Sequence, residues 1–290
     1  MHPAPSIIAF TTFSGLGLGL LFWLGVDPTP PTGWIGFAFF AIAFALAVGG
    51  LAASTFHLGR PERAAKAFTQ WRTSWLSREA WAATATLLVM GLHGFLLVFF
   101  GKAILPLGWL GAILALTTVY TTSMIYAQLR TVPRWHHWST SLLFLALALA
   151  GGALLSGRIT VALILILAAG GVQSWWWRTG DTRLAASGSD MASATGLGNI
   201  GKVTAFEPPH TGSNYLLREM VHVVGRKHAA KLRLAALGLM MVVPIVLLLL
   251  PFGHFLALLA VVSHVAGVLV ARWLFFAEAE HVVGLYYGKR

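Results

Sequence analysis

Long apolar segments separated by short polar connections dominate the chain. Eight such segments recur, each close to the roughly 20 residues that an α-helix needs to cross a bilayer. Their apolar residues are continuous and do not alternate with polar ones, so the pattern predicts membrane-spanning helices and not barrel strands. The predicted spans are Pro5–Val26, Gly33–Phe56, Glu79–Phe100, Gly108–Leu129, Trp138–Ser156, Ile159–Trp177, Leu234–Gly253 and His254–Phe276.

The predicted fold class is therefore an all-α integral membrane protein, a bundle of eight transmembrane helices. We treat residues 1–290 as a single transmembrane domain with one long polar insert at about 178–233. The first segment lacks a basic n-region and a small-residue cleavage site, so we expect it to be retained as a span and not cleaved as a signal peptide.

Positive charge gives the expected orientation. Seventeen Lys and Arg residues fall in the connections 57–79, 130–137 and 178–233 and in the C-terminal tail, whereas the opposite side holds only Lys102 and Arg158. Because basic residues stay on the cytoplasmic side, we expect these connections and both termini to be cytoplasmic, in a bacterial inner membrane. The net charge of +11 then reflects basic loops, and we predict no nucleic-acid partner.

Composition narrows the chemistry further. The chain is 57% hydrophobic and 10% charged, with a mean hydropathy of +0.77, and it contains no cysteine. Disulfides, thiolate-bound iron–sulfur clusters, Cys-ligated zinc and a Cys nucleophile are thereby excluded for this chain. Tryptophans gather at the predicted cytoplasmic ends, and interface anchoring explains most of them. They are Trp71, Trp75, Trp135, Trp138 and the run Trp175, Trp176 and Trp177.

The polar insert contains two patterns of interest. Gly196, Gly198 and Gly201 spell GxGxxG, but no strand precedes them and no helix follows, so we reject a nucleotide site. The later segment GSNYLLREMVHVVGRKHAAKLRLAALG reads as a basic amphipathic helix at the interface. We expect this region to dock a cytoplasmic partner in addition to contacting lipid.

The loop STFHLGRPERAAKAFTQWRTSWLSREAW, residues 54–81, carries the chemistry of most interest. His57 lies at its start and Glu79 at its end, both near the predicted membrane boundary. Quinone redox chemistry needs a proton donor or acceptor beside a quinone oxygen, and an imidazole cycles readily near neutral pH. From the residues alone, quinone chemistry and simple contact with lipid head groups both remain open.

Two other functional classes are relevant for comparison. His93, His254 and His264 lie in predicted spans, and a pair on different helices could ligate haem b, although lone histidines on apolar helices are more often hydrogen-bonded to neighbours. A transporter would need internal repeats, interrupted helices or polar groups at mid-depth, and we find no convincing case of these.

Three motifs resemble one known family. FHLGRPERAAKAF with SWLSRE is similar to the loop after the second span of DmsC-type membrane anchors of molybdoenzyme complexes. RTVPRWHHWST resembles the Thr-Val-Pro-x-Trp segment between the fourth and fifth spans of those anchors, and ARWLFFAEAEHVVGL resembles their Gly-Arg-x-x-Phe-Tyr end. Together with the eight-span plan, the resemblance covers most of the chain.

The resemblance implies a subunit that binds a quinone, ubiquinone or menaquinone, and exchanges electrons with an iron–sulfur subunit. That iron–sulfur protein connects to a molybdopterin catalytic subunit, and the anchor itself carries no haem or metal. The family's quinol-site histidine falls on His57 and its glutamate on Glu79. We add Arg60, Trp71, Arg72 and Trp75 as candidates for quinone positioning, and Glu207, His210, Asn214 and Tyr215 for partner docking.

The insert narrows the resemblance. FEPPHTGSNYLLREM is absent from the shorter dimethyl sulfoxide reductase anchors and looks like the branch that contains the membrane subunit of sulfite dehydrogenase. This branch implies sulfite oxidation coupled to quinone reduction. The alternative is an anchor of a dimethyl sulfoxide, or other S- or N-oxide, reductase that oxidises menaquinol.

Overall fold

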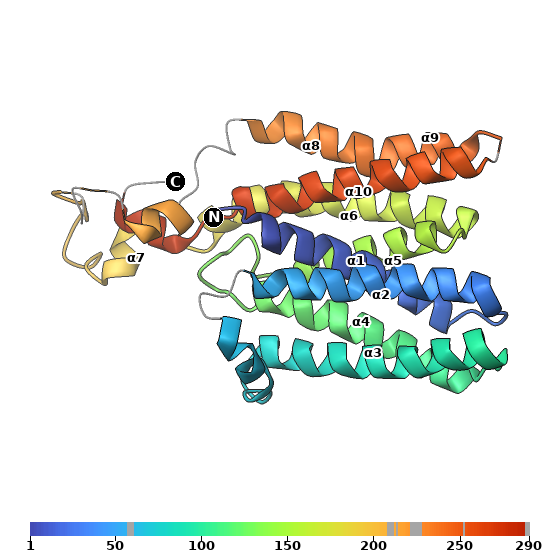
Figure 1. The fold of residues 1–290 in the computed structure, drawn as a ribbon. Coiled ribbons are helices and arrows are strands. Elements are labelled where there is room, and N and C mark those ends of the chain that lie inside the picture. Colours follow the sequence, from blue (N-terminus) through green and yellow to red (C-terminus); the bar gives the residue numbers. More distant parts are fainter. Residues whose placement is uncertain (57–60, 208–211, 213, 221–227, 252, 288–290) are drawn as a thin grey trace.

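The computed structural model describes residues 1–56, 61–207, 212, 214–220, 228–251 and 253–287. The described part is helical, and its long helices run along one common direction (Figure 1). The α-helices are α1 (Pro5–Gly25), α2 (Gly33–Thr55), α3 (Trp75–Phe100), α4 (Leu105–Ala127), α5 (Trp138–Leu155), α6 (Ile159–Ala186), α7 (Met191–Thr195), α8 (Ala229–Leu237), α9 (Val243–Leu249) and α10 (His254–Ala277). Shorter helical segments are η1 (Pro61–Phe68), η2 (Leu216–Met220), η4 (Gly238–Val242) and η5 (Val282–Tyr287).

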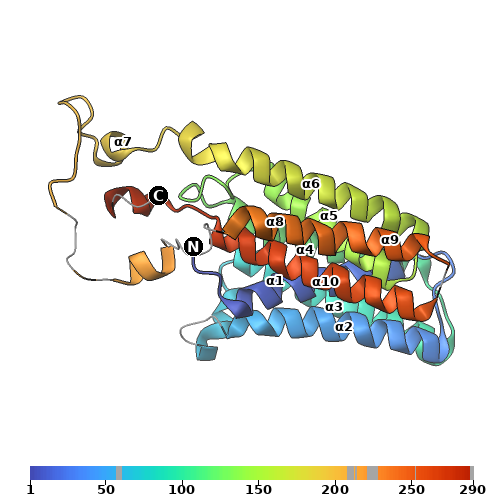
Figure 2. The same cartoon turned by 90° about the horizontal axis from the view of Figure 1, so that it is seen from above.

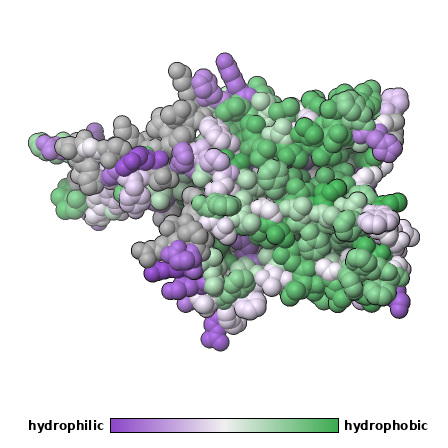
Figure 3. Space-filling model, in the orientation of Figure 1, coloured by the Kyte–Doolittle hydropathy of each residue, from purple (hydrophilic) through white to green (hydrophobic). Residues whose placement is uncertain are grey.

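Within the described residues, eight helices are long and apolar enough to cross a membrane. Seven of them are single α-helices, and the remaining one, Ala229–Leu249, is built from α8, η4 and α9 in succession. On the face shown in Figure 3, hydrophobic residues form a broad band over the bundle, while hydrophilic ones gather mainly at one end. The predicted all-helical class with eight spans is confirmed at this level, and the protein is a multi-pass membrane protein.

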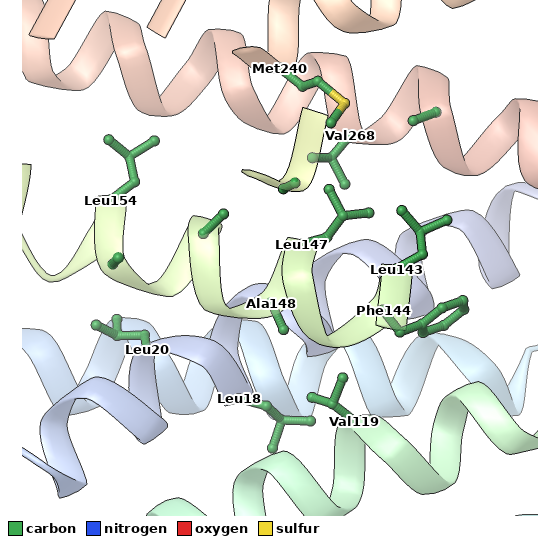
Figure 4. Close-up of a cluster of buried hydrophobic side chains, with 14 of the residues drawn as sticks. Leu18, Leu20, Val119, Leu143, Phe144, Leu147, Ala148, Leu154, Met240 and Val268 are labelled. Atoms are coloured by element: carbon green, nitrogen blue, oxygen red, sulfur yellow. The ribbon is translucent and has the colours of Figure 1, made fainter. Parts of the chain in front are cut away.

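Helices α1 and α5 form the centre of the bundle. α1 contacts α2, α4, α5 and α10, and α5 also contacts α4 and α6. Buried side chains from α1, α4, α5, η4 and α10 meet around α5, among them Leu18, Val119, Phe144, Leu147 and Met240 (Figure 4). The remaining helices surround this core and leave much of their apolar surface exposed, as a lipid environment requires.

Glycines allow α1 and α5 to approach each other closely. A Cβ added at Gly19 would overlap the backbone oxygen of Ala148, and one added at Gly152 would overlap the backbone of Gly19. Lipid removes the hydrophobic drive for helix association, so small residues and close backbone packing hold such helices together. The Gly19–Gly152 crossing is therefore a main determinant of the core geometry.

Replacing Gly19 with valine should prevent the α1–α5 crossing. The added atoms would meet backbone, which cannot move aside as a flexible side chain can, so we expect destabilisation of more than about 3 kcal/mol. The yield of monodisperse protein in detergent and its thermal unfolding midpoint measure this. Gly171→Val in α6 is the matched control, because an added Cβ there has nothing within 4 Å. Equal midpoints for the two variants would contradict the packing argument.

The first described residue, Met1, and the last described helix, η5, lie at one end of the bundle, which we call the insert end (Figures 1 and 2). The connections 56–74 and 128–137 and the polar insert lie at this end, and the short connections 26–32, 101–104, 156–158 and 250–253 lie at the far end. The amino group of Met1 donates hydrogen bonds to the carbonyl oxygens of Phe276 and Ala279, at 3.1 and 2.8 Å. This contact ties the start of α1 to the end of α10.

Three spans differ from the predictions: the seventh runs from Ala229 to Leu249 and not from Leu234 to Gly253, and α3 and α6 are longer than predicted. α3 begins at Trp75 and not at Glu79, so Glu79 lies one turn inside the helix. α6 continues to Ala186, nine residues beyond the predicted end at Trp177. Hydropathy marks where a helix leaves lipid, but the backbone hydrogen bonds of a helix continue into water without an apolar side chain. Both extensions carry ionisable residues toward the insert end.

The seventh span contains a π-helical segment, η4, just before Pro244 in α9. Proline has no N–H group, which leaves the carbonyl of Met240 without its usual helical donor. The His264 side chain on α10 takes this place, with Nδ1 2.7 Å from the Met240 oxygen. The irregular backbone is thus satisfied by a neighbouring helix, as membrane helices require.

Three of the seven tryptophans at the predicted cytoplasmic ends lie in the bundle core and do not face lipid. Trp135, Trp176 and Trp177 are buried, and the first two stack on either side of Phe275, with ring centroids 5.1 and 5.2 Å from it. Trp135 also donates from Nε1 to the Phe275 carbonyl, at 2.9 Å. Position in the sequence sets the depth of a tryptophan in the membrane but not the direction of its ring, and these three rings point into the bundle. Trp71, Trp138 and Trp175 are exposed and remain available for anchoring.

The insert projects away from the bundle (Figures 1 and 2). It contains the short helix α7, capped by Asp190 and Ser193, and the π-helical segment η2. The glycines of GxGxxG lie after α7 in a segment without regular structure, where they precede no helix. Of the predicted amphipathic helix at 212–238, the structure shows η2 and α8, while residues 221–227 lie outside the described part.

Candidate functional site

Glu79 is a buried carboxylate in the first turns of α3. Its residue surface is 4% exposed, and the Thr122 hydroxyl on α4 donates a hydrogen bond of 2.5 Å to Glu79 Oε1. Burying a carboxyl group costs free energy unless a partner compensates, so proteins seldom place one here without a use. Glu79 lies at the insert end of α3, close in sequence to the polar connection 56–74.

Tyr126 lies near Glu79, and Arg272 lies near Tyr126; the sequence pattern links neither of them to the carboxylate. Tyr126, one turn beyond Thr122 on α4, interacts electrostatically with both Glu79 and Arg272 of α10. Arg272 is 3% exposed, and its guanidinium carbon lies 3.7 Å from the centroid of the Phe144 ring. The sequence does show an arginine inside an otherwise apolar span, which indicates a functional residue. It does not show which residue the arginine interacts with.

The connection before α3 is held by Arg78. Its Nε and Nη2 donate to the carbonyl oxygens of Trp71 and Arg72, at 3.0 and 2.7 Å, and its guanidinium carbon lies 4.3 Å from the Trp75 ring centroid. Trp71 and Arg72 are exposed, whereas Trp75 is half-buried against Tyr120. His57 and Arg60 lie outside the described residues, directly after the end of α2, which packs against α3.

A second group of charges, which we call the ion cluster, joins four segments at the insert end. Arg134 Nη2 lies 2.7 Å from Asp181 Oδ1, and Arg233 Nη2 lies 2.6 Å from the same oxygen. Arg233 also bonds to Glu278 at 2.8 Å. Burial raises the pKa of Glu278, and the two guanidinium groups oppose this shift. The cluster connects the α4–α5 loop, α6, α8 and the end of α10.

The insert carries the residues predicted to dock a partner. Glu207 and Tyr215 are exposed, whereas Asn214 is engaged within the chain: its amide nitrogen donates to the Tyr287 hydroxyl at 3.0 Å. His210 lies outside the described residues. Three apolar side chains that the sequence analysis did not single out are more exposed than such groups usually are in water. Leu197, Ile200 and Phe206 are 47, 84 and 99% exposed.

The three histidines considered as haem ligands have different neighbours in the structure. His93 packs beside Phe40 of α2 and Gly108 of α4. His264 bonds to Met240 and approaches Gly151 of α5. His254 begins α10 at the far end. In the part of the chain that the structure describes, no group of three or more His, Asp or Glu side chains could hold a metal ion.

These features define a polytopic membrane protein whose charged side chains gather mainly at one end of an eight-helix bundle, with a buried carboxylate, Glu79, at the same end. The chain belongs to the family of DMSO reductase anchor subunits (DmsC), whose family model matches residues 6–174. The match covers the helices that hold Glu79, Thr122 and Tyr126. It ends within α6, before the insert.

Similarity to one curated relative extends over the whole chain. The chain is 33% identical to a subunit of the sulfite dehydrogenase of Allochromatium vinosum, over 99% of both chains. It is also 36% identical to the anaerobic dimethyl sulfoxide reductase chain YnfH of Escherichia coli K12, over 38% of this chain and 39% of that one. No solved structure matches. Membership of this family makes the chain the anchor subunit of a multi-subunit molybdoenzyme complex, which implies catalytic and iron–sulfur partner subunits.

Proposed function

We propose that this anchor binds a quinone at the insert end, beside Glu79, and exchanges electrons between the quinone pool and an iron–sulfur partner subunit. The observation that supports this most is the buried Glu79 carboxylate, fixed by Thr122 in the first turns of α3. His57 follows the neighbouring helix α2 in sequence, so the two proton-exchanging groups belong to adjacent helix ends.

The residues present fit a quinone site. When bound, a quinone takes up or releases two electrons and two protons at its ring oxygens, and its tail is soluble in the bilayer. Glu79 holds or gives up a proton from a buried position, and His57 is suited to exchange protons near neutral pH. Trp75, half-buried beside Tyr120, offers an aromatic face nearby, while Arg60, Trp71 and Arg72 remain proposed positioning residues.

For the substrate of the complex, we favour sulfite, with electrons passing from sulfite to quinone. Support comes from the similarity to a sulfite dehydrogenase subunit over the full length of the chain, including the insert that lies outside the family match. The alternative is an anchor that oxidises menaquinol for an S- or N-oxide reductase, which the partial similarity to a dimethyl sulfoxide reductase chain supports.

We place the insert end on the cytoplasmic side of a bacterial inner membrane. The connections and tail assigned to this end carry seventeen Lys and Arg residues, whereas the far end carries Lys102 and Arg158. Arg158 is further paired with Asp27, at 2.6 Å, which neutralises part of the small positive charge at the far end. This asymmetry follows the positive-inside rule.

We further propose that the insert docks the iron–sulfur partner. It projects beyond the bundle, outside the apolar band, and exposes Ile200 and Phe206 there (Figures 1 and 3). Exposed apolar groups away from lipid are typical of protein–protein interfaces. Glu207, His210 and Tyr215 add polar contacts at the rim, and Asn214 contributes by holding the insert against Tyr287.

The proposed quinone function is tested by replacing His57 with alanine. The substitution removes a proton-exchanging group, and we expect the complex still to assemble. We expect quinone-coupled turnover of the complex to fall about a hundredfold, while electron transfer to an artificial acceptor continues at the normal rate. His228, an exposed histidine at the start of α8, is the matched control as His228→Ala. Normal quinone coupling in the His57 variant would refute the assignment.

A further inference from the structure

Arg272 is a buried cation to which the proposed quinone function assigns no role. The residue lies in α10, is 3% exposed, and its Nε and Nη1 atoms find no hydrogen-bond acceptor among the described residues. The Phe144 ring beneath the guanidinium supplies a favourable cation–π contact but accepts no conventional hydrogen bond. Burying a charge whose hydrogen-bond donors are unpaired costs free energy. We therefore expect Arg272 to have a hydrogen-bond partner or a functional role.

A small polar cavity lies against this guanidinium. Thr11 and Ser14 of α1, Thr122 of α4 and Arg272 supply its polar wall. Leu18, Val119 and Phe144, which belong to the buried cluster drawn in Figure 4, supply the apolar wall. The free volume of about 10 Å³ corresponds to a single water molecule.

The hydroxyl groups of the cavity are arranged to accept hydrogen bonds. Ser14 Oγ donates to the Phe10 carbonyl at 2.6 Å, and Thr11 Oγ1 donates to the Ile7 carbonyl at 2.9 Å. Their protons are therefore engaged, and their lone pairs are available to a donor in the cavity. Arg272 brings only donors. One water molecule that accepts from Arg272 and donates to these oxygens would satisfy both sides with about three hydrogen bonds.

The same cavity connects to the candidate quinone site through Thr122. This threonine lines the cavity, and its hydroxyl lies within hydrogen-bond distance of both Glu79 Oε1, at 2.5 Å, and the Thr118 carbonyl oxygen, at 2.9 Å. Tyr126, one turn further along α4, interacts electrostatically with both Glu79 and Arg272. The carboxylate and the guanidinium thus lie on two sides of one buried polar network that includes a threonine and a tyrosine from α4.

We propose that Arg272 is a positioning residue for Glu79, acting through one water molecule in this cavity and through the Thr122 hydroxyl. This inference rests on the proposed quinone function and extends it to a residue of the last helix. The guanidinium supplies positive potential to the network, and the bound water keeps the Thr122 hydroxyl oriented toward the carboxylate. Glu79 then keeps the orientation and charge that proton exchange with the quinone requires.

A double-mutant cycle tests this coupling. The single variants Arg272→Met and Glu79→Gln and the double variant are compared in the intact complex, with quinone-coupled turnover and artificial-acceptor turnover as the two readouts. Two residues that act as a unit give non-additive losses. We expect Arg272→Met to lower quinone coupling by at least about tenfold in the native background. In the Glu79→Gln background it should add less than about twofold.

Conservative and distant variants separate positioning from a structural role. Arg272→Lys keeps the charge and a donor, so it should recover most of the coupling. Arg158→Gln, at the far end, removes a comparable cation that stacks on Trp23 and should leave the coupling unchanged. If Arg272→Met does not assemble, Thr122→Val and Thr122→Ser test the same network, with loss expected in the first and retention in the second.

The outcomes distinguish the proposed role of Arg272 from the proposed quinone site at Glu79. Additive losses in the double variant, or full quinone coupling in Arg272→Met or Thr122→Val, would overturn the role of Arg272 while leaving the quinone site in place. Full coupling in Glu79→Gln alone would instead remove Glu79 from the proposed quinone site. Loss of artificial-acceptor turnover in both Arg272→Met and Arg272→Lys would indicate a purely structural arginine and would also overturn the proposal.

Discussion

Replacing Glu79 with glutamine is expected to lower quinone-coupled turnover by about a hundredfold, while the complex still assembles. Glutamine has almost the same shape, and its amide oxygen can still accept the hydrogen bond from Thr122. The variant therefore keeps the packing of α3 against α4 but cannot take up or release a proton. The rate of electron exchange with a quinone, divided by the rate with an artificial acceptor, measures the effect.

Two companion variants make the Glu79 experiment specific. Glu62→Gln changes an exposed carboxylate of η1 in the same connection and should leave the ratio unchanged. Glu79→Asp keeps the acid but shortens the side chain, which moves it away from Thr122, so an intermediate loss is expected. An unchanged ratio in Glu79→Gln would show that this carboxylate has a structural role and takes no part in proton exchange.

Replacing both Ile200 and Phe206 with serine should release the partner subunits from the anchor. The two side chains are 84 and 99% exposed on the projecting insert, and apolar anchors at the centre of an interface carry much of its binding free energy. The proteins that co-purify with the tagged wild-type chain are identified by mass spectrometry, and their recovery is then compared with that of the variant. We expect recovery to fall at least about tenfold.

The controls for the insert distinguish docking from misfolding. Lys202→Ser alters an exposed residue between the two apolar positions and should keep the partners bound. The elution profile of the double variant in detergent should match that of the wild-type chain, because neither side chain contributes to the core. Full recovery of the partners with the double variant would refute apolar docking through this part of the insert.

Much of the transmembrane plan could be predicted from hydropathy alone. The eight predicted spans correspond to the eight candidate spans of the structure, because a lipid-crossing helix must be apolar over its whole length. The boundaries of α3 and α6 were less accurate. The turns that extend them, at Trp75–Arg78 and Arg178–Ala186, contain polar and charged residues, and hydropathy cannot distinguish such a helical turn from a loop.

The candidate site was only partly predictable. The pattern and the family resemblance singled out Glu79, and the structure shows that it is buried and bonded to Thr122. Nothing in the linear pattern distinguishes Thr122 from its threonine neighbours Thr117, Thr118 and Thr121. Tyr126 was equally hidden, since a tyrosine at a helix end is typical of interface anchoring. Their roles depend on which face of α4 is turned toward α3 and α10.

The sequence by itself predicted that the protein lies in a lipid bilayer and crosses it with eight helices. It also showed the asymmetry of the charges and the motifs of the family. These properties depend only on which residues occur and in which order, and not on how the helices pack. Three features became visible only in the folded bundle: Trp135 and Trp176 lie in the core, α6 brings Asp181 to the ion cluster, and Arg272 shares a cavity with Thr122. The cause is geometric, because helix rotation and helix pairing bring together residues that are far apart in the chain.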